Sequence, residues 1–261
     1  MDRGRRRATI PDRVPSCTPI ACLLLLWLAQ APQSAPASRP VAAALRTLVL
    51  PRANATQAGT QNNNIPFSWR PVRYQQCVAP EQFAFDGTLN LSGVALRLAA
   101  GHEDTTNSGD VDLEIALACG PRHFDELSNR FADNLVRDRV VVVPRRMVAI
   151  GRAAERAKGT PDTTVWDVHV PFRQPYAFKT DSVLVFEVRV FGNSHGDQLF
   201  TFPLDAVTVP GIKRLSGDLD AEQAQPGELG LVLRFDVASC HGTDLLAAAP
   251  AASRPTSQAV R

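Results

Sequence analysis

Several short runs of this chain alternate between apolar and polar residues with a period of two. In the run 111–117 the odd-numbered positions are apolar, whereas Asp112 and Glu114 are charged. The same pattern recurs in three further runs, at 166–172, 184–190 and 231–237. Because successive side chains of a strand point to opposite faces, each run predicts a strand with one face on a core and the other in water.

Loops that contain Gly, Pro, Asn and Asp separate these runs, and helical periodicity is weak. Segment 123–135 has roughly helical spacing over a turn or two. The chain therefore predicts an all-β fold, namely an antiparallel, jelly-roll-like β-sandwich of about eight to ten strands. Between Leu91 and Val94 the apolar positions change parity, which predicts a bulge or sharp bend at Gly93.

Composition divides the 261 residues into four parts. A basic stretch, a short apolar run and small residues mark 1–37 as a cleaved signal peptide, and the apolar run is shorter than the roughly 20 residues of a membrane span. Residues 38–64 predict a flexible lead-in, 65–240 the β-sandwich, and 241–261 a disordered tail. We therefore expect a secreted, periplasmic or cell-surface protein whose mature chain does not span a membrane.

The charge balance argues against nucleic acid as a partner. The formal net charge of the chain is +2, but five arginines and only two aspartates lie in its first 13 residues, so the remaining chain has a net charge of −1. Nucleic-acid binding depends on a basic surface that neutralises phosphates, and a nearly neutral body does not supply a broad one.

Three cysteines remain after the predicted signal peptide, namely Cys77, Cys119 and Cys240. In an oxidising compartment they allow one disulfide and one free thiol, with a pairing that the sequence does not reveal, and three reduced buried thiols fit equally well. Cys77 stands in the run RYQQCV, where no histidine nearby in sequence would turn its thiol into a thiolate nucleophile. We expect Cys77 to belong to a strand and not to a catalytic site.

Several segments follow one another in a recognisable order, namely RYQQCVAPEQF, LSGVALRL, DELSNRFADN, PFRQPYAF, VLVFEVRVF and GLVLRFDV. Over about residues 69–238 this order resembles a family of exported bacterial β-sandwich proteins of unassigned function, many of which end in a sorting tail of the PEP-CTERM type. Cys77 stands where an aromatic residue is common and Glu187 where an aspartate is common, and no sorting tail follows Cys240. The resemblance implies the fold and export, and it implies no catalytic residue.

The densest acidic loop is GHEDTTNSGDVDLE, residues 101–114. Its carboxylates Glu103, Asp104, Asp110 and Asp112 offer the oxygen ligands that Ca²⁺ prefers, although their spacing is not that of an EF-hand. A solvated hairpin loop explains the same charges. A calcium site at these four residues is therefore retained as a hypothesis, and we predict no other cofactor.

Glycoside hydrolysis needs two carboxylates that face each other across a cleft. Two pairs qualify by strand parity, Asp112 with Glu114 and Asp167 with Glu187, but charge on the solvent face of a sandwich explains them more simply. The chain contains no zinc-binding HExxH motif, no nucleophile elbow and no phosphate-binding loop. We expect a protein without enzymatic activity.

Sugar-binding sites combine exposed aromatic rings with polar side chains. Parity with Val168 places Trp166 in the core, which leaves Trp69 and Tyr176 as candidate ligand-binding rings, and the turn GNSHGD offers His195 beside them. The leading hypothesis is an extracellular module that binds a polysaccharide or matrix components. The alternatives are a glycan-degrading enzyme on a jelly-roll scaffold and a purely structural domain, because sandwiches serve all three functions.

Overall fold

The computed structural model describes residues 46–67, 70–102, 108–150, 163 and 165–244. All thirteen strands within these residues pair antiparallel, and helical residues there occur only in short 3-10 turns. The fold is therefore the all-β antiparallel sandwich that the alternating runs predict. The number of strands exceeds the prediction because three of them are only three residues long, too short to give an alternating pattern.

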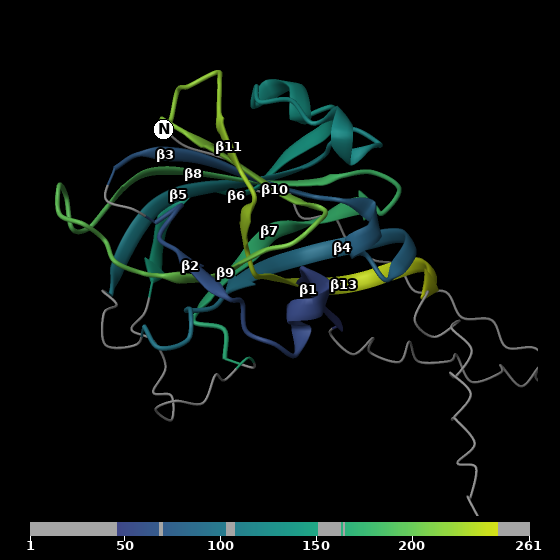
Figure 1. The fold of residues 1–261 in the computed structure, drawn as a ribbon, viewed down its shortest axis with the longest axis horizontal. Coiled ribbons are helices and arrows are strands. Elements are labelled where there is room, and N and C mark those ends of the chain that lie inside the picture. Colours follow the sequence, from purple (N-terminus) through teal and green to yellow (C-terminus); the bar gives the residue numbers. More distant parts are fainter. Residues whose placement is uncertain (1–45, 68–69, 103–107, 151–162, 164, 245–261) are drawn as a thin grey trace, which may run out of the picture. The chain divides into compact units, whose positions relative to one another are not determined.

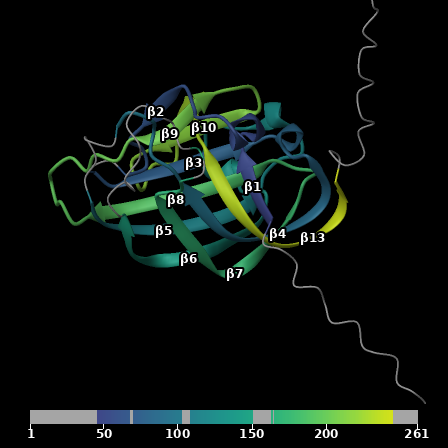
Figure 2. The same cartoon turned by 90° about the horizontal axis from the view of Figure 1, so that it is seen from below.

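Two large sheets and one small sheet make up the fold (Figure 1). The first sheet has the order β1-β13-β4-β7, formed by Arg46–Leu50, Leu233–Asp244, Phe85–Leu96 and Val168–Lys179. The second has the order β11-β10-β3-β8-β5-β6, formed by Gln225–Gly227, Ile212–Gly217, Val72–Val78, Leu184–Asn193, Gly109–Cys119 and Arg137–Ile150. The third has the order β12-β9-β2, formed by Leu229–Leu231, Leu204–Thr208 and Gln61–Asn63. Strands β6 and β7, one edge strand from each large sheet, lie side by side (Figure 2).

The main core lies between the two large sheets. The apolar positions of the predicted runs are buried there, among them Val111 and Leu113 of β5. Phe186 of β8 and Phe235 of β13 come from different sheets and meet edge to face, with ring centroids 6.1 Å apart. Burial of these alternating apolar faces against each other supplies the main driving force for folding.

A bulge interrupts β4 at the predicted position. The register between β4 and β7 shifts between Leu91 and Gly93. Beside it, the Nε2 of His169 on β7 lies 2.6 Å from Oδ2 of Asp236 on β13, although β4 runs between these two strands. A Cβ atom at Gly93 would lie 2.7 Å from that Asp236 oxygen. A side chain at position 93 would therefore have to displace the carboxylate of Asp236.

A second, smaller apolar cluster covers the outer face of the six-stranded sheet. Leu127 and Phe131, from the segment between β5 and β6, pack there on Cys77 of β3 and Val185 of β8. The same segment contains two 3-10 turns, η4 (Phe124–Glu126) and η5 (Ala132–Asn134), as its helical spacing predicts. Strand β3 is consequently buried on both faces, and the expectation that polar positions of β8 face water is wrong for Glu187, which is only 1% exposed.

The predicted flexible lead-in at 38–64 is wrong for its second half. Residues 46–50 form β1, a 3-10 turn η1 (Arg52–Ala55) follows, and residues 61–63 form β2. The buried guanidinium of Arg97 donates hydrogen bonds to the carbonyl oxygens of Asn54 and Gln57, and the carboxylate of Asp205 accepts one from the Gly59 amide. These contacts fix a segment whose polar composition alone predicts disorder.

At the other end, β13 continues to Asp244, past the predicted domain boundary at residue 240. The predicted signal peptide at 1–37 and the end of the predicted tail, 245–261, lie outside the described residues. Within the described residues, no helix has the length and hydrophobicity needed to cross a membrane.

Candidate functional site

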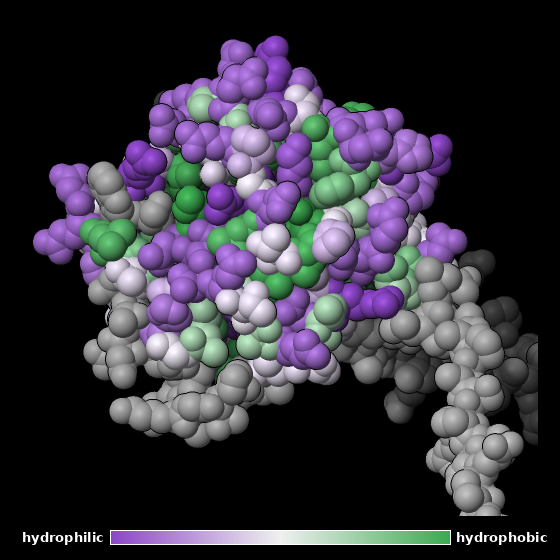
Figure 3. Space-filling model, in the orientation of Figure 1, coloured by the Kyte–Doolittle hydropathy of each residue, from purple (hydrophilic) through white to green (hydrophobic). Residues whose placement is uncertain are grey.

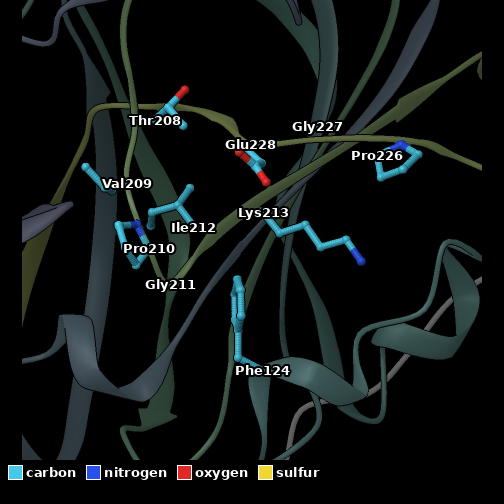
Figure 4. Close-up of a pocket in the computed structure, with 10 residues that line it drawn as sticks. All are labelled: Phe124, Thr208, Val209, Pro210, Gly211, Ile212, Lys213, Pro226, Gly227 and Glu228. Atoms are coloured by element: carbon cyan, nitrogen blue, oxygen red, sulfur yellow. The ribbon is translucent and has the colours of Figure 1, made fainter.

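A pocket of about 550 Å³ opens on the surface where the six-stranded and three-stranded sheets meet (Figure 4). Its lining comes from three separate segments of the chain, namely Phe124, residues 208–213 and residues 226–228. The face shown in Figure 3 carries hydrophobic side chains near its centre with polar side chains around them. A volume in this range, with a mainly apolar lining and a few polar groups, is typical of ligand sites.

The floor of the pocket is the turn between β9 and β10. Gly211 in this turn has a φ of +80°, a conformation that favours glycine. The turn is anchored from behind, because the Ala79 amide donates to the Gly211 carbonyl oxygen at 2.8 Å and the Gln82 side chain donates to the Pro210 carbonyl oxygen at 2.9 Å. The pocket therefore has a preformed floor and does not depend on a loose loop.

The opposite wall is the stretch in which the chain passes from β11 in one sheet to β12 in another. The side chain of Gln76 holds β12 in place, since its Oε1 accepts a hydrogen bond from the Leu231 amide at 2.7 Å and its Nε2 donates to the Leu231 carbonyl at 2.9 Å. The same Oε1 accepts from the Tyr74 hydroxyl at 2.8 Å. A Cβ atom at Gly230 would collide with Cγ2 of Ile212, so this stretch lies directly on β10.

Replacing Gln76 by leucine should lower the free energy of unfolding by about 3 kcal/mol, because three buried polar groups of Leu231 and Tyr74 lose their partner. Urea denaturation measures this loss. The matched control is Gln174→Leu, which changes an exposed glutamine of β7 and should shift the stability by less than about 0.5 kcal/mol. Equal effects of the two substitutions would show that Gln76 does not hold β12.

Polar and apolar side chains both line the pocket. The ring of Phe124 rises from the η4 turn towards Ile212 and Lys213 on β10, and Glu228 approaches from the opposite wall (Figure 4). The Nζ of Lys213 donates a hydrogen bond to the Leu127 carbonyl oxygen at 3.3 Å, which leaves its other protons for a ligand. The pocket thus offers the ring of Phe124 as an apolar surface, Lys213 as a hydrogen-bond donor and Glu228 as an acceptor. The exposed hydroxyl of Thr208 can act as either.

Among the carboxylates of the six-stranded sheet whose side chains the structure describes, Glu187 is the most deeply buried. Its oxygens accept hydrogen bonds from Arg73 at 2.7 Å, Gln75 at 2.7 Å and Arg139 at 2.9 Å, and Arg189 lies 3.5 Å away. Burial alone would raise the pKa of Glu187, but the charge of Arg73 and the hydrogen bonds from these side chains outweigh it and hold that pKa below its ordinary value. A general acid needs the opposite shift, so the site favours a structural carboxylate.

The other carboxylates considered for hydrolysis also have individual partners. Asp112 forms an ion pair with Arg145 at 2.7 Å, and Glu114 forms one with Arg139 at 3.2 Å. Asp167 accepts a hydrogen bond from the Leu98 amide at 2.7 Å, next to the four-stranded sheet. The structure therefore does not bring Asp167 together with Glu187, which lies on the outer face of the other sheet.

The three cysteines within the described residues form no disulfide with one another: Cys77 and Cys119 are buried and Cys240 is half-buried. Of the two alternatives left open by the sequence, this arrangement fits the one without a bridge among these three cysteines, except that Cys240 is not buried. Burial raises the pKa of the Cys77 thiol to about 12, and the nearby charge of Lys213 only partly opposes this. Cys77 therefore stays protonated at neutral pH and packs as a small apolar side chain in β3, as expected.

The calcium hypothesis rests mainly on residues that the structure does not describe. Glu103 and Asp104 lie outside the described residues. Asp110 is exposed at the start of β5, and Asp112 has its carboxylate engaged by Arg145. Among the described residues there is no group of three or more potential metal ligands. Asp112 is thus a poor ligand, and the rest of the hypothesis stays a prediction.

The candidate ligand-binding rings have different positions from those expected. Tyr176 is buried in the main core with its hydroxyl donating to Sγ of Cys119, so its prediction as a binding residue is wrong. Trp69 lies outside the described residues. His195 is half-buried in its turn, with Nε2 3.1 Å from the Ser108 carbonyl oxygen.

Trp166 lies outside the core, contrary to its strand parity. It is half-buried, and the guanidinium carbons of Arg97 and Arg234 lie 5.1 Å and 5.0 Å from the centre of its ring. The residue precedes β7, so the alternation of that strand does not extend to it. Its ring therefore makes cation–π contacts where the sequence predicts a core contact.

Sequence reasoning missed the pocket itself. Phe124 belongs to a weakly helical segment, and Lys213 and Glu228 stand in ordinary strand and turn contexts, so no local motif marks them. The sequence Val209-Pro210-Gly211 predicts a turn, but it does not predict which side chains lie opposite that turn in the pocket.

Comparison with models of known protein families, with curated proteins and with solved structures finds no match to this chain. The resemblance to exported bacterial sandwich proteins accordingly stays a prediction.

Proposed function

We propose that this protein is an exported, non-enzymatic β-sandwich module that binds a polysaccharide or a similar matrix polymer, and that the pocket between β9–β10, β11–β12 and Phe124 is its binding site. The observation that carries the proposal is the half-buried ring of Phe124 facing Lys213 and Glu228 across a pocket of about 550 Å³. A sugar ring stacks on an aromatic face while its hydroxyls pair with charged groups at the rim.

The state of the carboxylates supports binding over hydrolysis. Hydrolysis of a glycosidic bond requires one carboxyl group to be protonated near neutral pH. The arginines around Glu187 hold its pKa below the ordinary value and so favour its ionised form, and Asp112 and Glu114 are each engaged in an ion pair with an arginine. Glu228 of the pocket has no second acidic residue among the pocket-lining residues. A binding role therefore needs fewer assumptions than a catalytic one.

Replacing Phe124 by alanine should weaken polysaccharide binding about tenfold, equivalent to about 1.4 kcal/mol, because the stacking surface is lost. The measurement is retention of the purified protein on a panel of insoluble and soluble polysaccharides, with and without a calcium chelator. The control is Phe191→Ala, since Phe191 is also half-buried but lies against Arg145 on the outer face of β8. Equal weakening by both substitutions would exclude the pocket as the binding site.

The same tubes test for catalysis. A binding module retains the polymer without releasing reducing ends. Release of reducing ends by the wild-type protein, lost on substitution of a carboxylate, would replace the proposal by the degradative enzyme.

A further inference from the structure

Positive charge is concentrated on one border of the sandwich. Residues 46–244 contain 20 Arg and Lys against 24 Asp and Glu, a net charge of −4. Strands β6 and β7 alone contain six Arg and Lys and one Asp, a net charge of +5. The rest of this part of the chain therefore has a net charge of −9. Because β6 and β7 are neighbouring edge strands, this excess of positive charge lies along one border of the sandwich.

Four cations of this border have no acidic partner among the described residues. Arg139 and Arg145 are engaged by carboxylates of β5 and β8. The remaining four side chains are all exposed and form no ion pair with any residue that the structure describes, and we call them the cationic edge: Arg137 and Arg146 on β6, Arg173 and Lys179 on β7. Neighbouring exposed cations repel one another, so grouping them lowers the stability of the fold unless a bound anion neutralises them.

Protection of the strand edges does not explain this grouping. Edge strands avoid pairing with other chains by means of proline, which lacks an amide proton, or of charges of either sign. Prolines already interrupt these two strands at Pro144, Pro171 and Pro175. A body with a net negative charge would serve the same purpose with acidic residues. The prolines also exclude a partner that adds a regular β-strand, which leaves recognition to side chains.

We propose that the cationic edge binds an anionic polysaccharide, one that carries carboxylate or sulfate groups along a thin, extended chain. A single polysaccharide strand can follow the line of β6 and β7 without approaching the acidic remainder of the molecule. A DNA duplex is wider and carries one charge per about 1.7 Å, so it would also meet the repelling surface. Among the described residues of β6 and β7 the only exposed aromatic ring is that of His169, whose Nε2 lies 2.6 Å from the Asp236 carboxylate, so this border lacks the series of rings on which the bases of single-stranded nucleic acids stack.

This surface is separate from the pocket. Strand β6 is at one edge of the six-stranded sheet and β11, which lines the pocket, is at the other edge. The inference therefore does not depend on the function proposed for the pocket. The two proposals are tested by different measurements. Binding of neutral polysaccharides tests the pocket, and the salt dependence of binding to acidic polysaccharides tests the cationic edge.

The test compares two double variants that remove the same amount of charge. Arg146→Gln/Arg173→Gln removes two cations from the cationic edge, and Arg52→Gln/Arg130→Gln removes two exposed cations beside β1 and near β11, at the opposite edges of both sheets. Binding to polygalacturonate and to heparin is measured by calorimetry between 50 and 300 mM salt (on the order of the range in which counterion release is resolved). We expect the edge variant to bind roughly tenfold more weakly at low salt, with a shallower slope of log K against log salt, and the control variant to match the wild type.

Three outcomes would overturn the proposal. The first is an equal loss of polysaccharide affinity in both double variants, which would mean that binding depends on the net charge of the protein and not on the position of the cations. The second is tighter binding to duplex DNA or to anionic lipid vesicles than to either polysaccharide under the same conditions. The third is an affinity of the wild-type protein that does not change with salt. Circular dichroism and the thermal midpoint check that both variants fold, which we expect because none of the four side chains is buried.

Discussion

Replacing Asp205 by asparagine should lower the free energy of unfolding by about 3–5 kcal/mol, because it leaves the buried guanidinium of Arg97 without its counterion. Both side chains are 2% exposed, and Nε of Arg97 lies 2.6 Å from Oδ2 of Asp205. The pair also connects three parts of the chain. Arg97 directly follows β4, Asp205 is on β9, and both side chains form hydrogen bonds with the segment 54–59. For a domain of this size the expected fall in Tm is roughly 10 °C or more.

Chemical denaturation of the wild type, Asp205→Asn and the exposed control Asp197→Asn measures this effect. The control should change the stability by less than about 0.5 kcal/mol. The double variant Arg97→Met/Asp205→Leu should lose less stability than the sum of its single variants, since it removes both charges together. Additive losses would mean that the two side chains do not act as a pair. Proteolysis within 51–60 in Asp205→Asn, absent from the wild type, would locate the release of the segment that the pair holds.

Replacing Glu187 by glutamine should destabilise the protein by about 3 kcal/mol at pH 7, and the difference should shrink on acidification. Glu187 is 1% exposed and Arg73 11%, so the substitution leaves a nearly buried cation unpaired. Because the folded pKa of Glu187 is held below its unfolded value, its carboxylate stabilises the fold above that unfolded value, about 4.3. The contribution is lost as the pH falls from there through the folded pKa.

Unfolding free energies of the wild type and Glu187→Gln, measured at intervals between about pH 7 and pH 2.5, test both parts of the prediction. Subtracting the two curves removes the titration of all other carboxylates. Glu81→Gln, at an exposed position, is the control and should change the stability at pH 7 by less than about 0.5 kcal/mol. A difference between wild type and Glu187→Gln that stays constant down to pH 2.5 would mean that the ionised form of Glu187 is not what the arginines stabilise.

The fold was predictable from periodicity because burial of one strand face leaves a period of two in the sequence. The runs containing Leu113, Phe186 and Phe235 all form strands whose apolar faces are buried. The same reasoning fails where a strand is covered on both faces. By its parity Glu187 is expected to face solvent. The segment 124–135 nevertheless covers it together with Gln75, and strand parity does not reveal that a distant loop lies over a sheet.

The motif residues that suggested a family have structural roles in this fold. Leu127 and Phe131 fill the outer cluster, and the Asn134 side chain donates to Gln75 while its Oδ1 accepts from the Ser128 amide. These residues support the Glu187 site from outside and do not line the pocket. Phe124, only three residues earlier, lines the pocket instead, and nothing in its local sequence distinguishes the two roles.

The pairing of β1 with β13 determines how this module would respond to a mechanical pull. Strands β1 and β13 form an antiparallel ladder of five residue pairs, in which Arg46 lies opposite Val237. Beyond this pair, β13 continues to Asp244 and therefore passes the N-terminal end of β1. Both ends of the described chain therefore leave from the same end of the first sheet. A tension applied between them would open the ladder one pair at a time, starting at Arg46, and would not shear all its hydrogen bonds together. A domain in which the two ends leave in this way is poorly suited to transmit force along a filament.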